Sequence, residues 1–200
     1  SFVFPLQVAV LLSMTATILT TGAFYEDGFA DVCDGFGGGW TQEKILLIMK
    51  DSRVGAYGVI GIILLLATKF ALLSNMEVDT AILAMITGHV LSRGMAVTTM
   101  FALVYVREDE TSKVKPISKN LHKIDLVIAC VFSLLPLLLW PSWWFLAMLA
   151  PLFGIKYFLE RWFVKWIGGY TGDCLGTVQQ VMELVVYLSV VAIARFVAMG

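Results

Sequence analysis

The chain has 200 residues, of which 59% are hydrophobic and only 14% charged, and its mean hydropathy is +0.85. A soluble domain carries about 25% charged residues, so this composition excludes an ordinary water-soluble protein. The net charge of −1 provides no basic field, and nucleic acid is therefore not an expected partner. The length suits a single domain, so we expect residues 1–200 to form one integral-membrane domain.

Long apolar stretches predict the secondary structure, because about 20 apolar residues in a helix cross the bilayer core. In chain order the candidate spans are 2–22, 54–73, 80–106, 124–140, 142–159 and 178–199. The fourth and fifth are short, and Pro141 with its tryptophan neighbours predicts a hairpin turn at the membrane interface. The expected fold class is an all-α, polytopic membrane helix bundle with about six transmembrane helices.

Basic residues alternate between the connections, which predicts the orientation in the membrane. The first, third and fifth connections carry them: Lys44, Lys50 and Arg53; Arg107, Lys113, Lys115, Lys119 and Lys123; and Lys156, Arg161 and Lys165. The positive-inside rule places these connections in the cytoplasm of a multi-pass protein of the cell (inner) membrane. The first helix then starts outside, so we expect that a helix is missing before Ser1 and that the chain is an N-terminally truncated fragment.

An acidic sequence follows the first predicted span. Asp27, Asp31 and Asp34 are spaced by four and three residues, so on a helix they share one face. Like charges at this spacing repel unless a cation lies among them, and hard oxygen ligands favour Mg²⁺, which usually completes its shell with substrate phosphates. The alternative is a solvated acidic face. The glycines at 35 and 37–39 suit either backbone contact with phosphate or a flexible loop.

Basic residues precede the second predicted span. Lys50 and Arg53 are three residues apart and can contact phosphate together, while Asp51 between them either binds metal or orients Arg53. The alternative for the two basic residues is a juxtamembrane anchor on the cytoplasmic side.

The third predicted span contains a charge near its middle. Arg93 follows His89 by four residues, and an arginine at this depth costs about 3 kcal/mol, so it should face the bundle interior. We expect substrate phosphate or the aspartate cluster as its partner. His89 is either a structural or a catalytic residue.

A second acidic site precedes the last span. Asp173 lies in a glycine-rich sequence where a helix N-cap is expected, so it is either a cap or a functional carboxylate. Glu183 falls within the last span and needs a buried partner, for which Arg93 or a metal ion would serve.

Four of these sequences together resemble one family, the adenosylcobinamide-GDP ribazoletransferases, also called cobalamin synthases or cobalamin 5′-phosphate synthases. They are 27–35 (DGFADVCDG), 49–55 (MKDSRVG), 92–94 (SRG) and 169–176 (GYTGDCLG), and their order and spacing match over nearly the whole chain. Members of the family carry a longer N-terminal segment that includes a membrane helix, which agrees with the expected truncation.

The resemblance implies a single catalytic domain that transfers the adenosylcobinamide-phosphate group from adenosylcobinamide-GDP to α-ribazole or its 5′-phosphate, with release of GMP. It implies Mg²⁺ as cofactor, small-molecule substrates and membrane lipid as partners, and a cytoplasmic-facing active site; a homo-oligomer is compatible with the sequence. The roles that follow are metal ligands at Asp27, Asp31 and Asp34, phosphate contacts at Lys50, Arg53 and Arg93, and proton acceptance by Asp34 or Asp173.

Two other classes compete with this interpretation. The first is another Mg²⁺-dependent membrane enzyme with an aspartate-rich sequence, either a CDP-alcohol phosphatidyltransferase or a prenyl-diphosphate transferase. The phosphatidyltransferase pattern requires an arginine soon after the Asp-Gly pair and two later, more distant aspartates, which this chain lacks. The second class is a transporter or channel, which predicts repeat symmetry and broken helices, and the sequence indicates neither.

Overall fold

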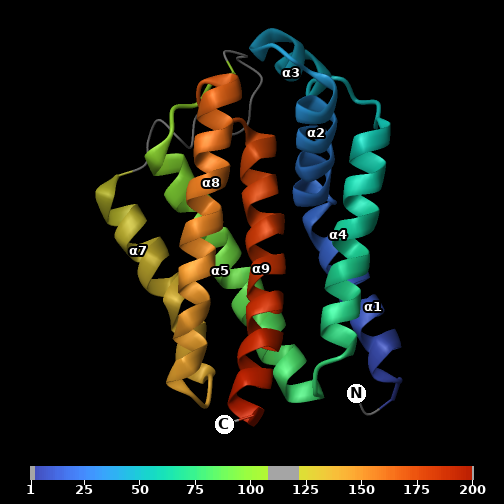
Figure 1. Ribbon diagram of the computed structural model, residues 1–200, viewed down its shortest axis with the longest axis vertical. Helices are drawn as coiled ribbons and strands as arrows, with labels where there is room; N and C mark the ends of the chain where they lie inside the picture. The colour runs from blue at the N-terminus through green and yellow to red at the C-terminus, as the bar shows by residue number, and fades with distance from the viewer. Residues whose placement is uncertain (1–2, 108–121, 200) are drawn as a thin grey trace.

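The computed structural model describes residues 3–107 and 122–199, and in those ranges the chain is a helix bundle without strands (Figure 1). The predicted all-α class is confirmed. The α-helices are α1 (Leu6–Thr21), α2 (Phe24–Gly38), α3 (Gln42–Ile48), α4 (Ala56–Ser74), α5 (Val78–Ala102), α7 (Lys123–Leu134), α8 (Leu149–Ile167) and α9 (Gly172–Met199), and two short 3-10 helices are η1 (Leu135–Leu139) and η2 (Trp143–Met148).

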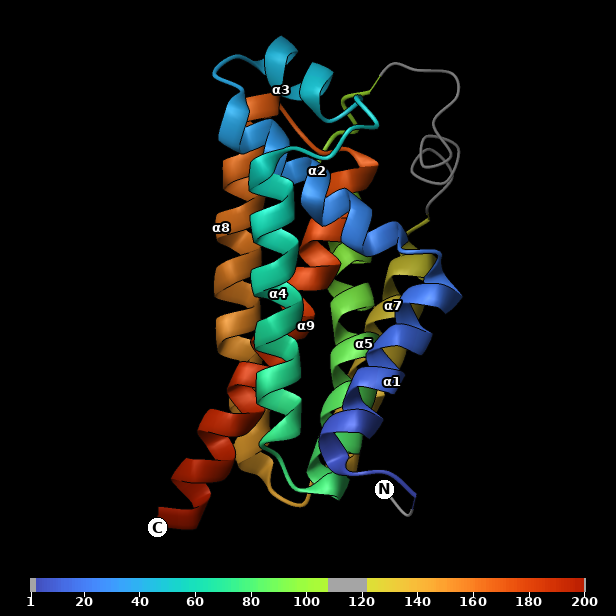
Figure 2. The same cartoon turned by 90° about the vertical axis from the view of Figure 1, so that its right-hand side faces the viewer.

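A sharp bend separates α1 from α2. Gly22 and Ala23 are both left-handed, with φ of 63° and 57°, and the two helix axes differ in direction by 87°. Glycine adopts this conformation freely, whereas at Ala23 it is strained and needs the surrounding structure to hold it. The bend turns the chain after the first predicted span, so that α2 runs toward the end of the bundle where α3 lies (Figure 2).

Fewer helices than predicted are both long and apolar enough to cross a membrane. Among the described residues three qualify, α4, α5 and most of α9, and α1 with α2 makes a fourth if the bent pair is one span. The predicted spans 124–140 and 142–159 do not qualify. The first range contains the 12-residue α7 followed by η1. The second contains η2 and the first part of α8, a helix that carries Lys156, Glu160, Arg161 and Lys165.

The described parts of the connections predicted to be basic lie toward one end of the bundle. Figures 1 and 2 show α3 lying across this end, beside the start of α9 and the end of α8, while both termini lie toward the opposite end. Of the basic residues that set the predicted orientation, Lys113, Lys115 and Lys119 lie outside the described residues. The end that carries α3 is called the α3 end below.

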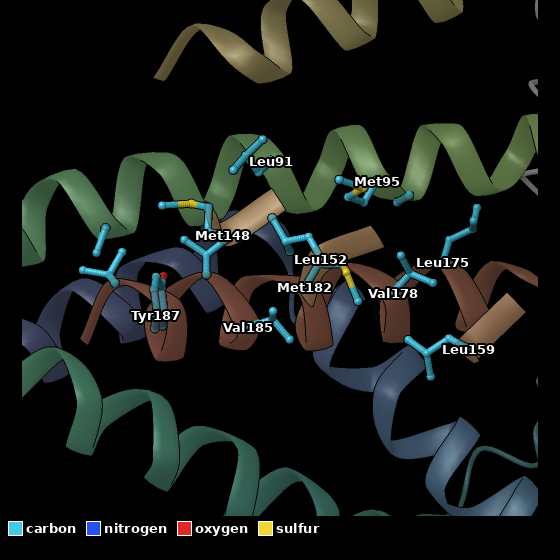
Figure 3. Close-up of a cluster of buried hydrophobic side chains, with 14 of the residues drawn as sticks. Leu91, Met95, Met148, Leu152, Leu159, Leu175, Val178, Met182, Val185 and Tyr187 are labelled. Atoms are coloured by element: carbon cyan, nitrogen blue, oxygen red, sulfur yellow. The ribbon is translucent and has the colours of Figure 1, made fainter. Parts of the chain in front are cut away.

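Helix α9 forms the centre of the packing. Its side chains Leu175, Val178, Met182 and Val185 are buried. They belong to one apolar cluster with side chains of α5, η2 and α8, namely Leu91, Met95, Met148, Leu152 and Leu159 (Figure 3). Other faces of α9 contact α2 and α4. The central helix therefore determines how the polar residues of its neighbours are placed.

Candidate functional site

Small residues let α2 and α9 approach closely at the α3 end. A β-carbon on Gly28 would lie 2.9 Å from Cα of Asp173, and one on Gly176 would lie 3.1 Å from the carbonyl oxygen of Tyr25. A larger residue at either position would push the helices apart. These two glycines bring the first acidic sequence against the second.

Three aspartates and an arginine gather where these helices meet. Asp31 is half-buried on α2, and the negative charge acting on it most strongly is that of Asp173 on α9, followed by that of the exposed Asp27. Arg107 forms an ion pair with Asp173 at 3.1 Å and also acts on Asp31. We call Asp27, Asp31, Asp173 and Arg107 the acidic site. Because three carboxylates face one guanidinium, the acidic site keeps an excess of negative charge.

Asp34 is predicted to bind metal or accept a proton with the other aspartates, and the structure places its carboxylate against the start of α4. Its side chain is buried, and its two oxygens accept hydrogen bonds from the backbone N–H groups of Gly55 at 2.6 Å and Gly58 at 2.8 Å. A β-carbon on Gly55 would lie 2.5 Å from a carboxylate oxygen of Asp34. Asp34 therefore anchors the first turn of α4, whose N–H groups have no helical partner.

Sequence reasoning used Arg107 only to orient the chain and missed it as a site residue. The segment before it pairs with the loop before α9, because Tyr170 donates its N–H to the Val104 carbonyl at 2.9 Å and Val106 donates to the Tyr170 carbonyl at 3.0 Å. Arg107 also donates to the carbonyl of Met49 at 3.0 Å. The short backbone pairing thus places the guanidinium beside Asp173. No local sequence pattern predicts this pairing.

This pairing depends on Gly169, and replacing that glycine provides a test. A β-carbon there would overlap the Val104 carbonyl oxygen, so Gly169→Ala should break the pairing and lower stability by about 2 kcal/mol. Gly154→Ala is the matched control, since nothing lies within 4 Å of a β-carbon at that position in α8, and it should be neutral or stabilising. Thermal unfolding of the two variants in detergent measures the difference; equal melting temperatures would contradict the role of Gly169.

The acidic site has the side chains of a partial site for a divalent cation. Among the described residues no three His, Cys, Asp or Glu side chains form a ready-made metal-binding group. Mg²⁺ commonly takes only one or two carboxylates and completes its shell with water and substrate phosphates. The chemistry of Asp27, Asp31 and Asp173 fits such a partial site, whereas both oxygens of Asp34 already accept backbone hydrogen bonds.

The basic residues before α4 lie on an exposed loop. Arg53 pairs with Asp51 at 2.7 Å, and its side chain is 87% exposed. The hydrogen bonds from Arg53 hold the pKa of Asp51 at about 2, so the carboxylate is ionised at neutral pH. Two roles were considered for Asp51, metal binding and orientation of Arg53, and in the structure its carboxylate contacts Arg53. Lys50 is exposed on the same loop.

A second polar cluster lies deeper in the bundle, between α4, α5 and α9. Glu183 pairs with Lys69 at 3.0 Å and not with Arg93, contrary to one of the predicted pairings, and it also accepts hydrogen bonds from Gln179 and Tyr187. Lys69 was missed by sequence reasoning, although a lone lysine in an apolar span is itself a signal.

Arg93 has no ion-pair partner among the residues that the structure describes. It donates to the His89 carbonyl at 2.8 Å and stacks over the Tyr25 ring, and the expected pairing with the aspartate cluster is not observed.

The fold and the acidic site define a helical, multi-span membrane protein with a carboxylate-rich polar centre at one end of its bundle. Comparison with known proteins then gives the family. The cobalamin-5-phosphate synthase family matches residues 1–191, and the chain belongs to that family. The sequence prediction of a membrane transferase of cobalamin synthesis is confirmed at this level.

Curated relatives carry one common name, adenosylcobinamide-GDP ribazoletransferase. The protein of Shewanella amazonensis is 48% identical over 192 residues, which cover 94% of this chain and 74% of the relative. That of Leptospira interrogans is 40% identical over 201 residues, covering 95% of this chain and 75% of the relative. No solved structure matches the chain.

Proposed function

We propose that the chain transfers the adenosylcobinamide-phosphate group of adenosylcobinamide-GDP to α-ribazole or to its 5′-phosphate. The relatives' printed name supports the reaction, since proteins 40% and 48% identical to the chain share it. The observation that carries the proposal to particular residues is the meeting of Asp27 and Asp31 on α2 with Asp173 on α9, beside Arg107.

The reaction exchanges one oxygen on phosphorus for another. A hydroxyl of α-ribazole forms a bond to the phosphorus nearest the cobinamide, the bond from that phosphorus to the bridging oxygen breaks, and GMP leaves with that oxygen. The hydroxyl proton passes to a base. Catalysis of this kind consists mainly of positioning and charge stabilisation.

The residues of the acidic site suit these steps. Asp27 and Asp31 would hold Mg²⁺, which neutralises the diphosphate when it is bound. Asp173 is the better candidate for the base, because the oxygens of Asp34 are already hydrogen-bonded to α4. Arg107 would exchange its contact with Asp173 for a phosphate oxygen, and Lys50 and Arg53 would contact phosphate from the α3–α4 loop.

The acidic site would face the cytoplasm. Described basic residues at the α3 end, including Lys44, Lys50, Arg53 and Arg107, support this orientation through the positive-inside rule. Exposed apolar side chains on α4, such as Ile60, Ile63 and Leu64, suit contact with lipid in the same arrangement.

The activity is tested by measuring GMP release from adenosylcobinamide-GDP by the purified protein, with and without α-ribazole and Mg²⁺. The proposal requires that GMP appear only when both are present. Absence of GMP release under all four conditions, from protein that remains folded in detergent, would refute it.

A separate variant tests the structural role of Asp34. Asn in its place keeps one acceptor oxygen but turns an NH₂ group toward the second N–H donor, so Asp34→Asn should lower stability by about 2 kcal/mol. The Mg²⁺ concentration that gives half-maximal GMP release should not change, because the proposed metal ligands are Asp27 and Asp31. Asp51→Asn, on the exposed loop, is the control and should leave the melting temperature unchanged. An Asp34 variant with normal stability that needs a higher Mg²⁺ concentration for half-maximal GMP release would restore Asp34 as a metal ligand.

A further inference from the structure

A polar hollow opens between α1 and α5, away from the acidic site. It has a volume of about 460 Å³, and hydroxyl groups of α1, together with His89 and Arg93 of α5, line it. A smaller cavity of about 20 Å³ adjoins it, sharing Ser13, Thr17, His89 and Arg93 with the hollow. In Figure 2, α1 crosses obliquely in front of α5 at this position. None of the aspartates of the acidic site lines either space.

Three buried side-chain atoms of residues that line the cavity have no hydrogen-bond partner within the described part of the chain. One is Nδ1 of His89, which lies 3.4 Å from a carboxylate oxygen of Glu183. The other two are acceptor oxygens: Oε2 of Glu26, a residue only 9% exposed, and Oε1 of Gln179, which is 1% exposed. Their other side-chain polar atoms are engaged, since Gln180 donates to Oε1 of Glu26 and Nε2 of Gln179 donates to Glu183. A buried acceptor without a partner is energetically unfavourable, so a ligand that donates hydrogen bonds to these two oxygens would bind favourably.

Arg93 provides hydrogen-bond donors at the same place. Its guanidinium lines both spaces and pairs with no carboxylate among the described residues, so some of its five N–H donors remain for an acceptor. Apart from His89, which lies 3.4 Å from Glu183, the formal charges of Glu26 and Glu183 are balanced by those of Lys69 and Arg93. An ionic ligand would upset this balance in a buried site, whereas a neutral group that both donates and accepts would not.

We propose that the cavity binds a primary carboxamide of the corrinoid substrate and thereby selects amidated corrinoids. The amide NH₂ donates to Glu26 and Gln179, and the amide oxygen accepts from Arg93. The inference rests on the proposed function, because cobinamide carries neutral carboxamide side chains around its ring. A carboxylate in the same place would face Glu26 and lack the NH₂ donor, and sites built on buried hydrogen bonds reject such analogues strongly.

Equilibrium dialysis of the full chain in detergent tests the proposal, with the visible absorbance of the corrinoid as readout. The probes are cobinamide, which has neither nucleotide nor phosphate, and cobyrinic acid, in which carboxylates replace the amides. The unmodified chain should bind cobinamide at least about tenfold more tightly than cobyrinic acid. Equal binding of the two corrinoids would overturn the inference.

Matched variants identify the cavity as the site. Glu26→Gln should raise the Kd for cobinamide about tenfold and raise KM for adenosylcobinamide-GDP with little change in kcat, because it removes a charge-assisted hydrogen bond. The control is Glu77→Gln, an exposed residue at the start of α5, which should bind cobinamide normally. Arg93→Met is the second variant, measured in case Glu26→Gln does not fold.

Cobinamide binding that is unchanged in both Glu26→Gln and Arg93→Met would show that the cavity holds only water, and would overturn the proposal. A chain that binds cobinamide with the expected preference but releases no GMP would uphold the amide site and refute the proposed function. The two failures are therefore distinguishable.

Discussion

Asp31→Asn is expected to lower the rate of GMP release by about 100-fold or more, while the protein remains folded. The charges of both Asp173 and Asp27 act on Asp31, so Asp31 couples the carboxylate of α9 to those of α2 in the acidic site. Single preorganised electrostatic groups in active sites contribute on this scale. The same substitution removes repulsion between like charges, so the melting temperature of the variant should equal or exceed that of the unmodified chain. Steady-state GMP release and thermal unfolding in detergent together check the prediction.

The control for Asp31→Asn is Asp79→Asn. Asp79 is an exposed aspartate in the first turn of α5, at the end of the bundle opposite α3 (Figure 1), and its substitution should leave GMP release unaffected. If Asp31→Asn retained near-normal turnover, the acidic site would have no part in the reaction. A large fall in its melting temperature would instead show that Asp31 acts through the fold.

Lys69→Met should cause the largest loss of stability among these substitutions, about 3 kcal/mol. Lys69 is 4% exposed, and its ammonium group lies 3.0 Å from a carboxylate oxygen of Glu183, so its removal leaves that buried carboxylate without its lysine partner. Removal of one member of a buried pair costs far more than loss of an exposed pair. Chemical unfolding in detergent measures the change in free energy.

Two further variants separate the ion pair from other effects of the substitution. Lys69→Met combined with Glu183→Gln should recover part of the stability, because no uncompensated charge then remains. Lys44→Met, on an exposed part of α3, controls for the change from lysine to methionine and should be close to neutral. If the double variant were as unstable as the sum of the two single variants, the pair would not be coupled.

Local sequence singled out the three aspartates of the acidic site but not Arg107 beside them. The spacing of Asp27 and Asp31 correctly indicated neighbouring carboxylates on one helix, and the four sequences that resemble the family led to the correct family. Asp34 fits the same spacing, yet its carboxylate accepts hydrogen bonds from Gly55 and Gly58. Periodicity gives the face of a helix, but whether that face meets a metal site or another helix depends on packing.

The sequence by itself determined the helical membrane class and the family, because both follow from properties carried along the chain: apolar runs long enough for a bilayer, and residues at fixed spacing. The tertiary structure decided which charges meet. Asp173 reaches Asp31 because Gly28 and Gly176 let α2 and α9 approach, and Glu183 takes Lys69 because α4 packs beside α9. Such pairings join residues more than a hundred positions apart, and they depend on bends and helix contacts that no local pattern records.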